Sequence, residues 1–456
     1  MVRNVRLLLL AAILPGILSS SRDTRPSPIV SSGQDAPLAN TPPMGWNSWD
    51  AYGTNVREEQ VKANADAMAR DLALFGYRYV VVDIQWYQPT AHGHEYIPGA
   101  SLAMDEYGRL MPAVNRFPSS ANGAGFKPLA DYVHALGLKF GIHVMRGIPR
   151  QAVKKNTPIV GTPYHAADVV DTTNECAWNP DMWGIDVRKP GGQAYYDAIA
   201  QLYASWGVDF VKADDMGSHR FQPREISALR RALDLTGRPI VLSISPGPAP
   251  LDAASFLAQH AQLWRISDDF WDDWILVRRQ FDYARDWARF VGDHHTWPDA
   301  DMLPFGQLRL TDSAGQGTPT RLTPDEQRTV MTLWSIFRSP LIIGGNLHTL
   351  DGPTLALLTN TEVLSVNQHG RAPRQVLERP GVRVWRSTIP GSADQYIAVF
   401  NIDSVAHQFN FTWSDVGVST GRHLVRDLWN HRSLGKAGRL HVDLPSHASA
   451  CFRIDQ

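Results

Sequence analysis

A short apolar stretch that ends in charged side chains decides how this chain folds. It reads Val208-Asp209-Phe210-Val211-Lys212-Ala213-Asp214-Asp215. Its β-branched and aromatic residues predict a buried parallel strand, and such strands carry polar side chains at the carboxyl end, where ligands bind. Asp214 is therefore the first candidate for chemistry. Alternatively, Lys212 and Asp214 form an ion pair with a purely structural role, since they lie two residues apart on one face of the strand.

The same design recurs along the chain, because short β-rich runs alternate with helical segments from Pro43 onward. Strands are predicted at 44–49, 79–83, 139–143, 208–215, 239–245, 263–267, 296–297 and 340–343. Helices are predicted at 58–75, 129–136, 194–206 and 354–366, and a capping box predicts another that begins at Thr323. Eight such units in about 320 residues predict an α/β fold, a (β/α)8 TIM barrel.

The character of the chain changes beyond Gln368. Short alternating runs lie at 382–386, 396–401, 407–412, 423–427 and 448–454, separated by Gly, Pro, Ser and Asp. This pattern predicts a small antiparallel β-sandwich. We therefore expect the barrel at residues 42–368 and an all-β domain at 369–456. A chain of 456 residues is also too long for one ordinary core.

The N-terminus predicts export. Basic residues among the first six, an apolar run at 7–18 and small residues at 19–21 are typical of a secretory signal peptide, too short to span a bilayer. Residues 22–41 predict a flexible leader. We expect a secreted or periplasmic protein with no membrane partner once residues 1–21 are removed. The two cysteines, Cys176 and Cys451, fall in different predicted domains and are expected to be free.

Composition narrows the class of partner. The 44 Lys and Arg residues nearly balance the 45 Asp and Glu residues, which argues against nucleic acid or an anionic membrane surface. The 15 Trp residues are many for this length, and Trp stacks on the apolar faces of sugars. A neutral polar substrate such as a carbohydrate therefore fits best. The oligomeric state stays open, a homo-oligomer included.

Polar and aromatic side chains follow most of the predicted strands. They are Trp49, Asp83, His143, Lys212, Asp214, Ser245, Arg265, Asp269 and Asp301. In a barrel all strand ends meet at one mouth, and so many polar groups are unfavourable to bury unless they meet a ligand. Taken singly, Asp83 could cap a loop, His143 could be a satisfied core histidine and Trp49 could be plain packing.

Two of these carboxyl groups fit glycoside hydrolysis. That reaction needs an ionised nucleophile and a protonated acid on either side of an anomeric carbon, close together when configuration is retained. Asp214 suits the ionised role because the nearby Lys212 favours the charged form. Asp269 suits the acid/base role, since the like charges of Asp268 and Asp272 would raise its pKa.

A metal site is the competing hypothesis. His294, His295, Asp299 and Asp301 lie close in sequence and include ligand types for a divalent ion. No HExxH motif or spaced Cys/His pattern accompanies them. We therefore expect chemistry with no metal and no cofactor.

Four stretches carry recognisable motifs: PMGWNSW at 43–49, VDFVKADD at 208–215, WRISDD at 264–269 and WPDADML at 297–303. Together they resemble glycoside hydrolase family 27, the α-galactosidase family. The resemblance implies a retaining enzyme with a (β/α)8 barrel, a following antiparallel β domain and no metal. It implies Asp214 as nucleophile and Asp269 as acid/base. The sugar-binding positions that it implies are Trp49, Asp83, Lys212, Arg265 and Asp301.

Departures from the family pattern bear on specificity. Where α-galactosidases carry two adjacent aspartates after the second strand, this chain has Asp83 followed by Ile84. Ile84 offers no acceptor to a sugar C6 hydroxyl, a loss of about 1–3 kcal/mol. A β-L-arabinopyranoside is the same ring without C6, and an isoleucine here resembles the β-L-arabinopyranosidase branch.

Three further positions differ from the pattern of the family that this chain resembles. Ser245 stands where galactose-specific members have a Glu, which leaves room for a 2-acetamido group as in α-N-acetylgalactosaminidases. His143 replaces a family Tyr in the substrate site. Met216 replaces a family Cys and so removes a disulfide to the loop of Cys176.

We therefore expect a secreted exo-glycosidase that hydrolyses terminal α-D-galactopyranosyl or homologous β-L-arabinopyranosyl residues by double displacement. The alternatives are a strict β-L-arabinopyranosidase, because of Ile84, and then an α-N-acetylgalactosaminidase, because of Ser245. A protein of a different class, an inactive carbohydrate-binding protein on the same scaffold, is disfavoured because Asp214 and Asp269 are both present.

Overall fold

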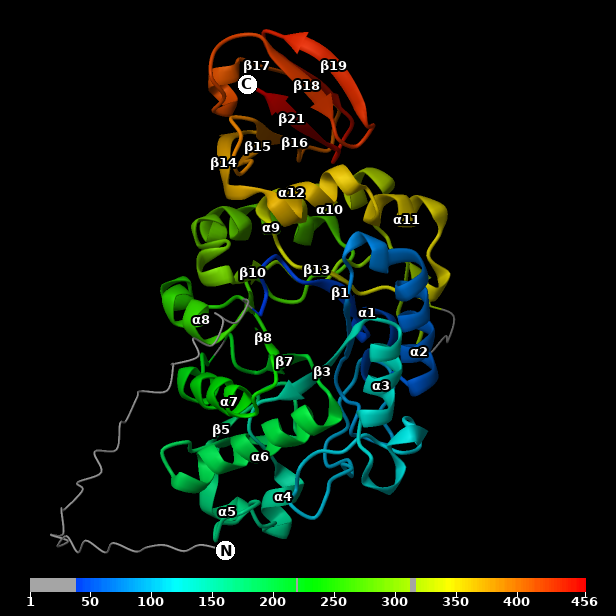
Figure 1. Ribbon diagram of the computed structural model, residues 1–456, viewed down its shortest axis with the longest axis vertical. Coiled ribbons are helices and arrows are strands. Elements are labelled where there is room, and N and C mark those ends of the chain that lie inside the picture. The colour runs from blue at the N-terminus through cyan, green and yellow to red at the C-terminus, as the bar shows by residue number, and fades with distance from the viewer. Residues whose placement is uncertain (1–37, 219, 312–316) are drawn as a thin grey trace, which may run out of the picture. The chain divides into compact units, whose positions relative to one another are not determined.

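The computed structural model describes residues 38–218, 220–311 and 317–456 (Figure 1). The predicted signal peptide at 1–21 lies outside the described residues, as does the predicted leader except for its last four positions. Within the described ranges, no helix combines the length and the apolar character that a bilayer crossing needs.

Eight parallel strands form the central sheet. In order of adjacency they are β10 (Trp297–Asp299), β9 (Leu263–Arg265), β8 (Val241–Ile244), β7 (Phe210–Asp214), β3 (Lys139–Met145), β2 (Tyr79–Val82), β1 (Met44–Asn47) and β13 (Leu341–Ile343). The two outer strands meet where Leu303, just after β10, pairs in parallel with Ile343. Its backbone nitrogen donates to the carbonyl of Ile342 at 2.7 Å. The sheet therefore curls closed, and the predicted (β/α)8 barrel is confirmed.

Large side chains and glycines lie next to one another in the barrel interior. Tyr79, Val81 and Phe210 belong to one buried cluster inside it. A Cβ atom on Gly45 would lie 2.2 Å from the carbonyl oxygen of Tyr79, and one on Gly141 would lie 2.9 Å from Val81. The two glycines are therefore needed because the neighbouring strands approach too closely for any side chain.

Helices follow the strands around the barrel (Figure 1). They are α1 (Trp49–Tyr52), α2 (Glu58–Ala67), α3 (Lys127–Ala135), α4 (Arg150–Lys155), α5 (Ala166–Val169), α6 (Pro190–Trp206), α7 (Pro223–Leu235), α8 (Ala254–His260), α9 (Trp274–Trp287), α10 (Pro324–Phe337), α11 (Gly352–Leu358) and α12 (Thr361–His369). Thr323 caps α10 as predicted, because its hydroxyl accepts from Glu326 N at 3.3 Å.

Two predicted helices differ in detail. The helix at 58–75 is α2 followed by a π-helical turn at Met68–Leu72 and a 3₁₀ turn at Ala73–Phe75. The helix at 354–366 is divided into α11 and α12, because Asn360 accepts from two backbone nitrogens and starts a new helix. The apolar spacing alone does not show this break.

Long loops that follow the strands hold two small sheets absent from the prediction. One joins β4 (Ile148–Pro149), β6 (Met182–Ile185) and β5 (Val170–Glu175), and the other joins β11 (Gln307–Leu308) to β12 (Thr318–Pro319). Because these loops leave the carboxyl ends of β3 and β10, they build the rim around the mouth of the barrel.

Antiparallel sheets follow the barrel in the chain. One has the order β14 (Arg371–Arg379), β15 (Val382–Thr388), β16 (Gln395–Asn401), β21 (Ser449–Asp455), β18 (His423–Asp427) and β19 (Arg432–Ala437). The other pairs β17 (His407–Phe411) with β20 (Leu440–Leu444). A shared apolar core lies between them, as the sandwich prediction requires. Cys176 and Cys451 are both buried and free, as predicted.

Candidate active site

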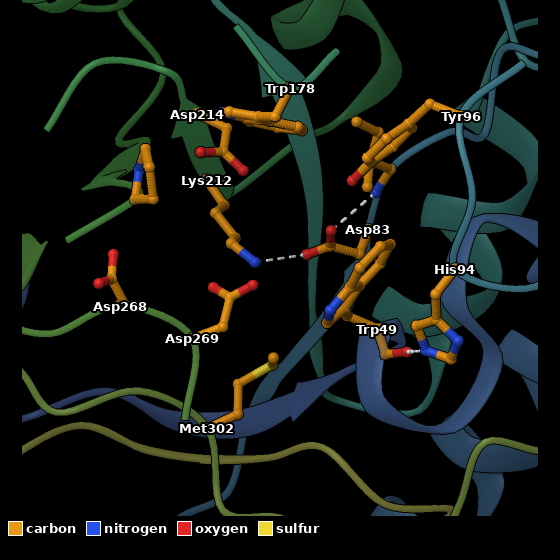
Figure 2. Close-up of a pocket in the computed structure, with 12 residues that line it drawn as sticks. Trp49, Asp83, His94, Tyr96, Trp178, Lys212, Asp214, Asp268, Asp269 and Met302 are labelled. Carbon is orange, nitrogen blue, oxygen red and sulfur yellow. Dashed lines mark hydrogen bonds and ion pairs between the residues drawn. The ribbon is translucent and has the colours of Figure 1, made fainter. Parts of the chain in front are cut away.

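A pocket of about 430 Å³ lies at the carboxyl ends of the barrel strands (Figure 2). It is lined by Trp49, Asp83, Ile84, His94, Tyr96, Trp178, Lys212, Asp214, Pro246, Asp268, Asp269 and Met302. Six of these are residues that the sequence places in the site: Trp49, Asp83, Ile84, Lys212, Asp214 and Asp269. The size falls in the range of small-molecule sites.

Asp214 ends β7 and is held by two hydrogen bonds. Its Oδ2 lies 2.9 Å from Nε2 of His143, and its Oδ1 accepts from the backbone nitrogen of Asp215 at 2.8 Å. Burial alone would raise the pKa of Asp214, but the hydrogen bond and charge of His143, with the charge of Lys212, bring it below its usual value. Asp214 is therefore an ionised carboxylate that faces the pocket.

His143 lies behind Asp214 rather than in the pocket wall. The ring is fully buried, and its Nδ1 lacks a hydrogen-bond partner within the described part of the chain. Because an ionised carboxylate can only accept, Nε2 carries the proton and donates it to Asp214. His143 is thus a hydrogen-bond donor that orients this carboxylate.

Asp83 and Lys212 form a second charged group in the pocket. Lys212 Nζ lies 2.8 Å from Asp83 Oδ2, and Asn47 donates to the same oxygen at 2.6 Å. Although burial opposes it, the charges of Lys212 and His143 lower the pKa of Asp83 to about 2. Burial likewise opposes charge on Lys212, but Asp83 and Asp214 raise its pKa overall. Both groups therefore stay charged. Their ion pair joins Lys212 on β7 to Asp83 at the end of β2, and it passes over the strand between them, β3.

Asp269 reaches the pocket from the loop after β9. Its side chain is 58% exposed, and Arg265 Nη2 lies 3.3 Å from its Oδ1. The same guanidinium is bound more tightly by Asp301, at 2.7 Å, below the pocket. In the view of Figure 2 the carboxylates of Asp214 and Asp269 lie above and below the Lys212 ammonium group. The pocket thus brings together a buried carboxylate and a solvent-accessible one.

Asp272 does not supply the like charge beside Asp269 that the sequence predicts. It is buried and pairs with Arg309 at 2.5 Å and with Arg321 at 3.2 Å. Burial would raise the pKa of Asp272, but the hydrogen bonds from Arg309 and Arg321 lower it overall. Of the two expected neighbours, Asp268 alone lines the pocket with Asp269.

Four residues expected in the pocket wall lie beneath it: His143, Ser245, Arg265 and Asp301. Arg265 and Asp301 support Asp269, as described above. The carbonyl of Ser245 accepts from Met216 N at 2.9 Å, which fixes the turn after Asp214. Pro246, the next residue, lines the pocket in place of Ser245.

An aromatic wall, which we define as Trp49, His94, Tyr96 and Trp178, faces the carboxylates (Figure 2). The rings of Trp49 and Tyr96 are nearly parallel, at 10°, and Tyr96 lies 5.4 Å from Trp178 between ring centroids. His94 and Tyr96 come from the long loop after β2, where no periodic pattern could place them. Such rings stack against the apolar face of a sugar.

Arg116 fixes this long loop. The guanidinium is buried and donates to the carbonyls of Thr54, Val56, Gln85 and Gln88, at 2.7–3.3 Å. Burial lowers its pKa to about 9. One side chain therefore ties the start and the end of the loop to the barrel, a role that nothing in the sequence indicates.

The structure separates the residues of the metal hypothesis. His294 and His295 precede β10, whereas Asp299 and Asp301 lie at and beyond its carboxyl end. Asp301 is bound by Arg265. Across residues 38–218, 220–311 and 317–456, no three or more His, Cys, Asp or Glu side chains are grouped so as to hold a metal ion.

Comparisons with known proteins show which family this chain belongs to. The family described as Alpha galactosidase A matches residues 41–187 and 184–369, and the Alpha galactosidase C-terminal beta sandwich domain matches 380–454. The α-galactosidase of Coffea arabica is 30% identical over 421 residues, which cover 91% of this chain and 94% of that protein.

One solved structure is much more similar. It is a β-L-arabinopyranosidase of glycoside hydrolase family 27 from Geobacillus stearothermophilus, 52% identical, with a TM-score of 0.89 over 92% of this chain and 97% of that chain. The α-N-acetylgalactosaminidase of Gallus gallus is 30% identical over 352 residues, 73% of this chain and 71% of that protein. This chain therefore belongs to glycoside hydrolase family 27, the α-galactosidase family.

Proposed function

We propose that this glycoside hydrolase is an exo-acting β-L-arabinopyranosidase that retains configuration, with Asp214 as nucleophile and Asp269 as acid/base. The observation that carries the choice of sugar is Ile84, whose side chain lines the pocket directly beside Asp83. The 52% identity to a β-L-arabinopyranosidase supports the same choice. The N-terminal 21 residues support export of the enzyme.

The two carboxyl groups divide the chemistry according to their surroundings. Asp214, ionised and held by His143, attacks the anomeric carbon and forms a glycosyl ester. Asp269 protonates the departing oxygen, and it then removes a proton from the water that cleaves the ester. Its 58% exposure suits a group that must exchange protons with solvent in each cycle. Asp83 and Lys212 bind sugar hydroxyls and discriminate between sugars that differ in hydroxyl position.

Ile84 explains a preference for a pentose. A galactosyl unit carries a C6 hydroxyl that must lose water on entering the pocket, and an isoleucine side chain cannot replace the lost hydrogen bond. Without C6, an arabinopyranosyl unit avoids this cost and contacts Ile84 through carbon. The difference of about 1–3 kcal/mol corresponds to about 5- to 150-fold in kcat/KM.

We expect the wild type to hydrolyse p-nitrophenyl β-L-arabinopyranoside with a higher kcat/KM than p-nitrophenyl α-D-galactopyranoside. In Ile84→Asp the ratio of the two values should move toward the galactoside by about tenfold or more, because the new carboxylate accepts from the C6 hydroxyl. Ile84→Val is the matched control and should keep the wild-type preference. A wild type that prefers the galactoside would contradict the assignment of the sugar while leaving the mechanism intact.

His143→Phe should shift the pH dependence of activity. His143 lowers the pKa of Asp214, and a hydrogen bond to a charged group is worth about 1.5–3 kcal/mol, or about one to two pH units. Loss of this hydrogen bond raises the pKa of Asp214. As the pH is lowered, the nucleophile is therefore protonated at a higher pH than in the wild type. The acid limb of the kcat/KM profile should therefore move upward by about one unit.

His143→Gln provides the control for this profile, since its amide can still donate to Asp214. It should keep the acid limb near the wild-type position. An unmoved acid limb in His143→Phe, with catalysis otherwise measurable, would mean that Asp214 does not set this limb.

A further inference from the structure

A second hollow adjoins the active-site pocket and shares its His94 wall. It measures about 700 Å³ and is lined chiefly by His92, His94, Glu95, Trp271 and Arg309. None of the positions assigned above to the sugar or to catalysis lies in it, apart from His94 of the aromatic wall. It is therefore a place where the remainder of a substrate can lie.

The indole of Trp271 is the central feature of this hollow. It follows Asp269 by two residues on the same loop and is partly exposed. The Arg309 guanidinium lies 4.7 Å from the ring centroid, and the His94 ring lies 5.6 Å from it, nearly perpendicular. His94 in turn contacts Trp49, with ring centroids 5.0 Å apart. A continuous aromatic path thus leads from the pocket to Trp271.

Contacts of its side chain and its backbone hold Arg309 in place. Its side chain pairs with the buried Asp272 at 2.5 Å. Its backbone nitrogen donates to the carbonyl of Asp50 at 2.8 Å, in the helix that also carries Trp49. Asp272 balances its charge, and Glu95 adds a carboxylate to the lining of the hollow. An aromatic ring with planar polar groups of both signs suits a neutral sugar rather than an ion.

We infer that the Trp271–Arg309 hollow binds the sugar ring that bears the departing oxygen, so that the substrates are oligosaccharides rather than simple alkyl glycosides. This inference rests on the proposed mechanism, because Asp269 must donate its proton to that oxygen. Trp271 follows Asp269 by two residues and lines the hollow that shares His94 with the pocket. A leaving sugar stacked there keeps its glycosidic oxygen within the reach of this carboxyl group.

The test exploits the second step of the reaction. A hydroxyl of a sugar acceptor can replace water: its oxygen bonds to C1, the C1–Oδ bond to Asp214 breaks, and the acceptor proton passes to Asp269. The acceptor must occupy the site that the leaving group has vacated. The donor is whichever of the two p-nitrophenyl glycosides the full-length enzyme hydrolyses, so an error about the sugar in the pocket does not affect the result.

Methyl β-D-galactopyranoside and methanol serve as the competing acceptors, and chromatography measures the two transfer products in one reaction. We expect Trp271→Leu to lower transfer to the sugar about tenfold relative to methanol, and Trp271→Tyr to lower it much less because a ring remains. Because both transfer products form in the same reaction, their ratio does not depend on the overall activity of the variant. Release of p-nitrophenol shows that each variant is folded and active.

Arg150→Ala is the matched control. Arg150 lines a different hollow, which adjoins the pocket through Tyr96 and Trp178, and the variant should leave the ratio unchanged. A ratio that falls in Arg150→Ala and stays constant in Trp271→Leu would place the leaving sugar in that other hollow and overturn the inference. A ratio unchanged in every variant would also overturn it. A wild type that hydrolyses neither donor would overturn the proposed function itself.

Discussion

Asp214→Ala is expected to lower kcat by about 10⁴-fold or more, because the substitution removes the carboxylate proposed to form the glycosyl ester. The pocket that binds the sugar stays in place, so a substrate should still bind. Initial rates with p-nitrophenyl β-L-arabinopyranoside, together with the melting temperature of the variant, separate lost chemistry from lost folding.

Azide identifies the role of this carboxylate. In Asp214→Ala a small anion can enter the space of the missing side chain and attack C1 directly, which gives a glycosyl azide of inverted configuration. NMR determines the anomeric configuration of the glycosyl azide. A product of retained configuration would assign Asp214 to the acid/base role and contradict the proposal.

Asp269→Ala is expected to lower kcat/KM by about 10²–10⁴-fold for a substrate whose leaving group is a sugar. The loss should be much smaller for a dinitrophenyl glycoside, because that leaving group departs without protonation. Azide should now attack the glycosyl ester in place of water and give a glycosyl azide of retained configuration. Asp214→Ala and Asp269→Ala therefore predict opposite stereochemistry for the same added anion.

Asp268→Ala is the control for this assignment, since Asp268 also lines the pocket and is the adjacent residue. It should show neither the dependence on leaving group nor rescue by azide. If Asp268→Ala shows both and Asp269→Ala shows neither, the acid/base is Asp268, and the proposed roles of Arg265 and Asp301 as supports of the acid/base are wrong.

The sequence was sufficient for the barrel because a buried parallel strand leaves a local signal. Runs such as the one that ends at Asp214 are apolar throughout, since both faces of the strand are covered. The strands β14, β19 and β20 escaped prediction. Residues of β19 are mostly exposed at the edge of a sheet, and Gly435 interrupts the run, so alternation was absent there.

The same reasoning predicted part of the candidate site. Residues at strand ends, such as Asp83 and Lys212, line the pocket because strand geometry brings them to the mouth of the barrel. Strand ends alone do not show which of these residues reach the cavity and which contact the residues that do, as His143 contacts Asp214 and Arg265 contacts Asp269. His94 lies on a loop whose course depends on tertiary contacts alone.

Arg116 has a consequence for how quickly and tightly a sugar can be captured. Arg116 lies near the end of the loop that carries His94 and Tyr96, and its guanidinium donates to Gln85 and Gln88 at the start of this loop, so the two ends are joined without a ligand. Association then does not have to include the loss of conformational freedom of a long loop, an entropy that would otherwise be subtracted from the binding free energy.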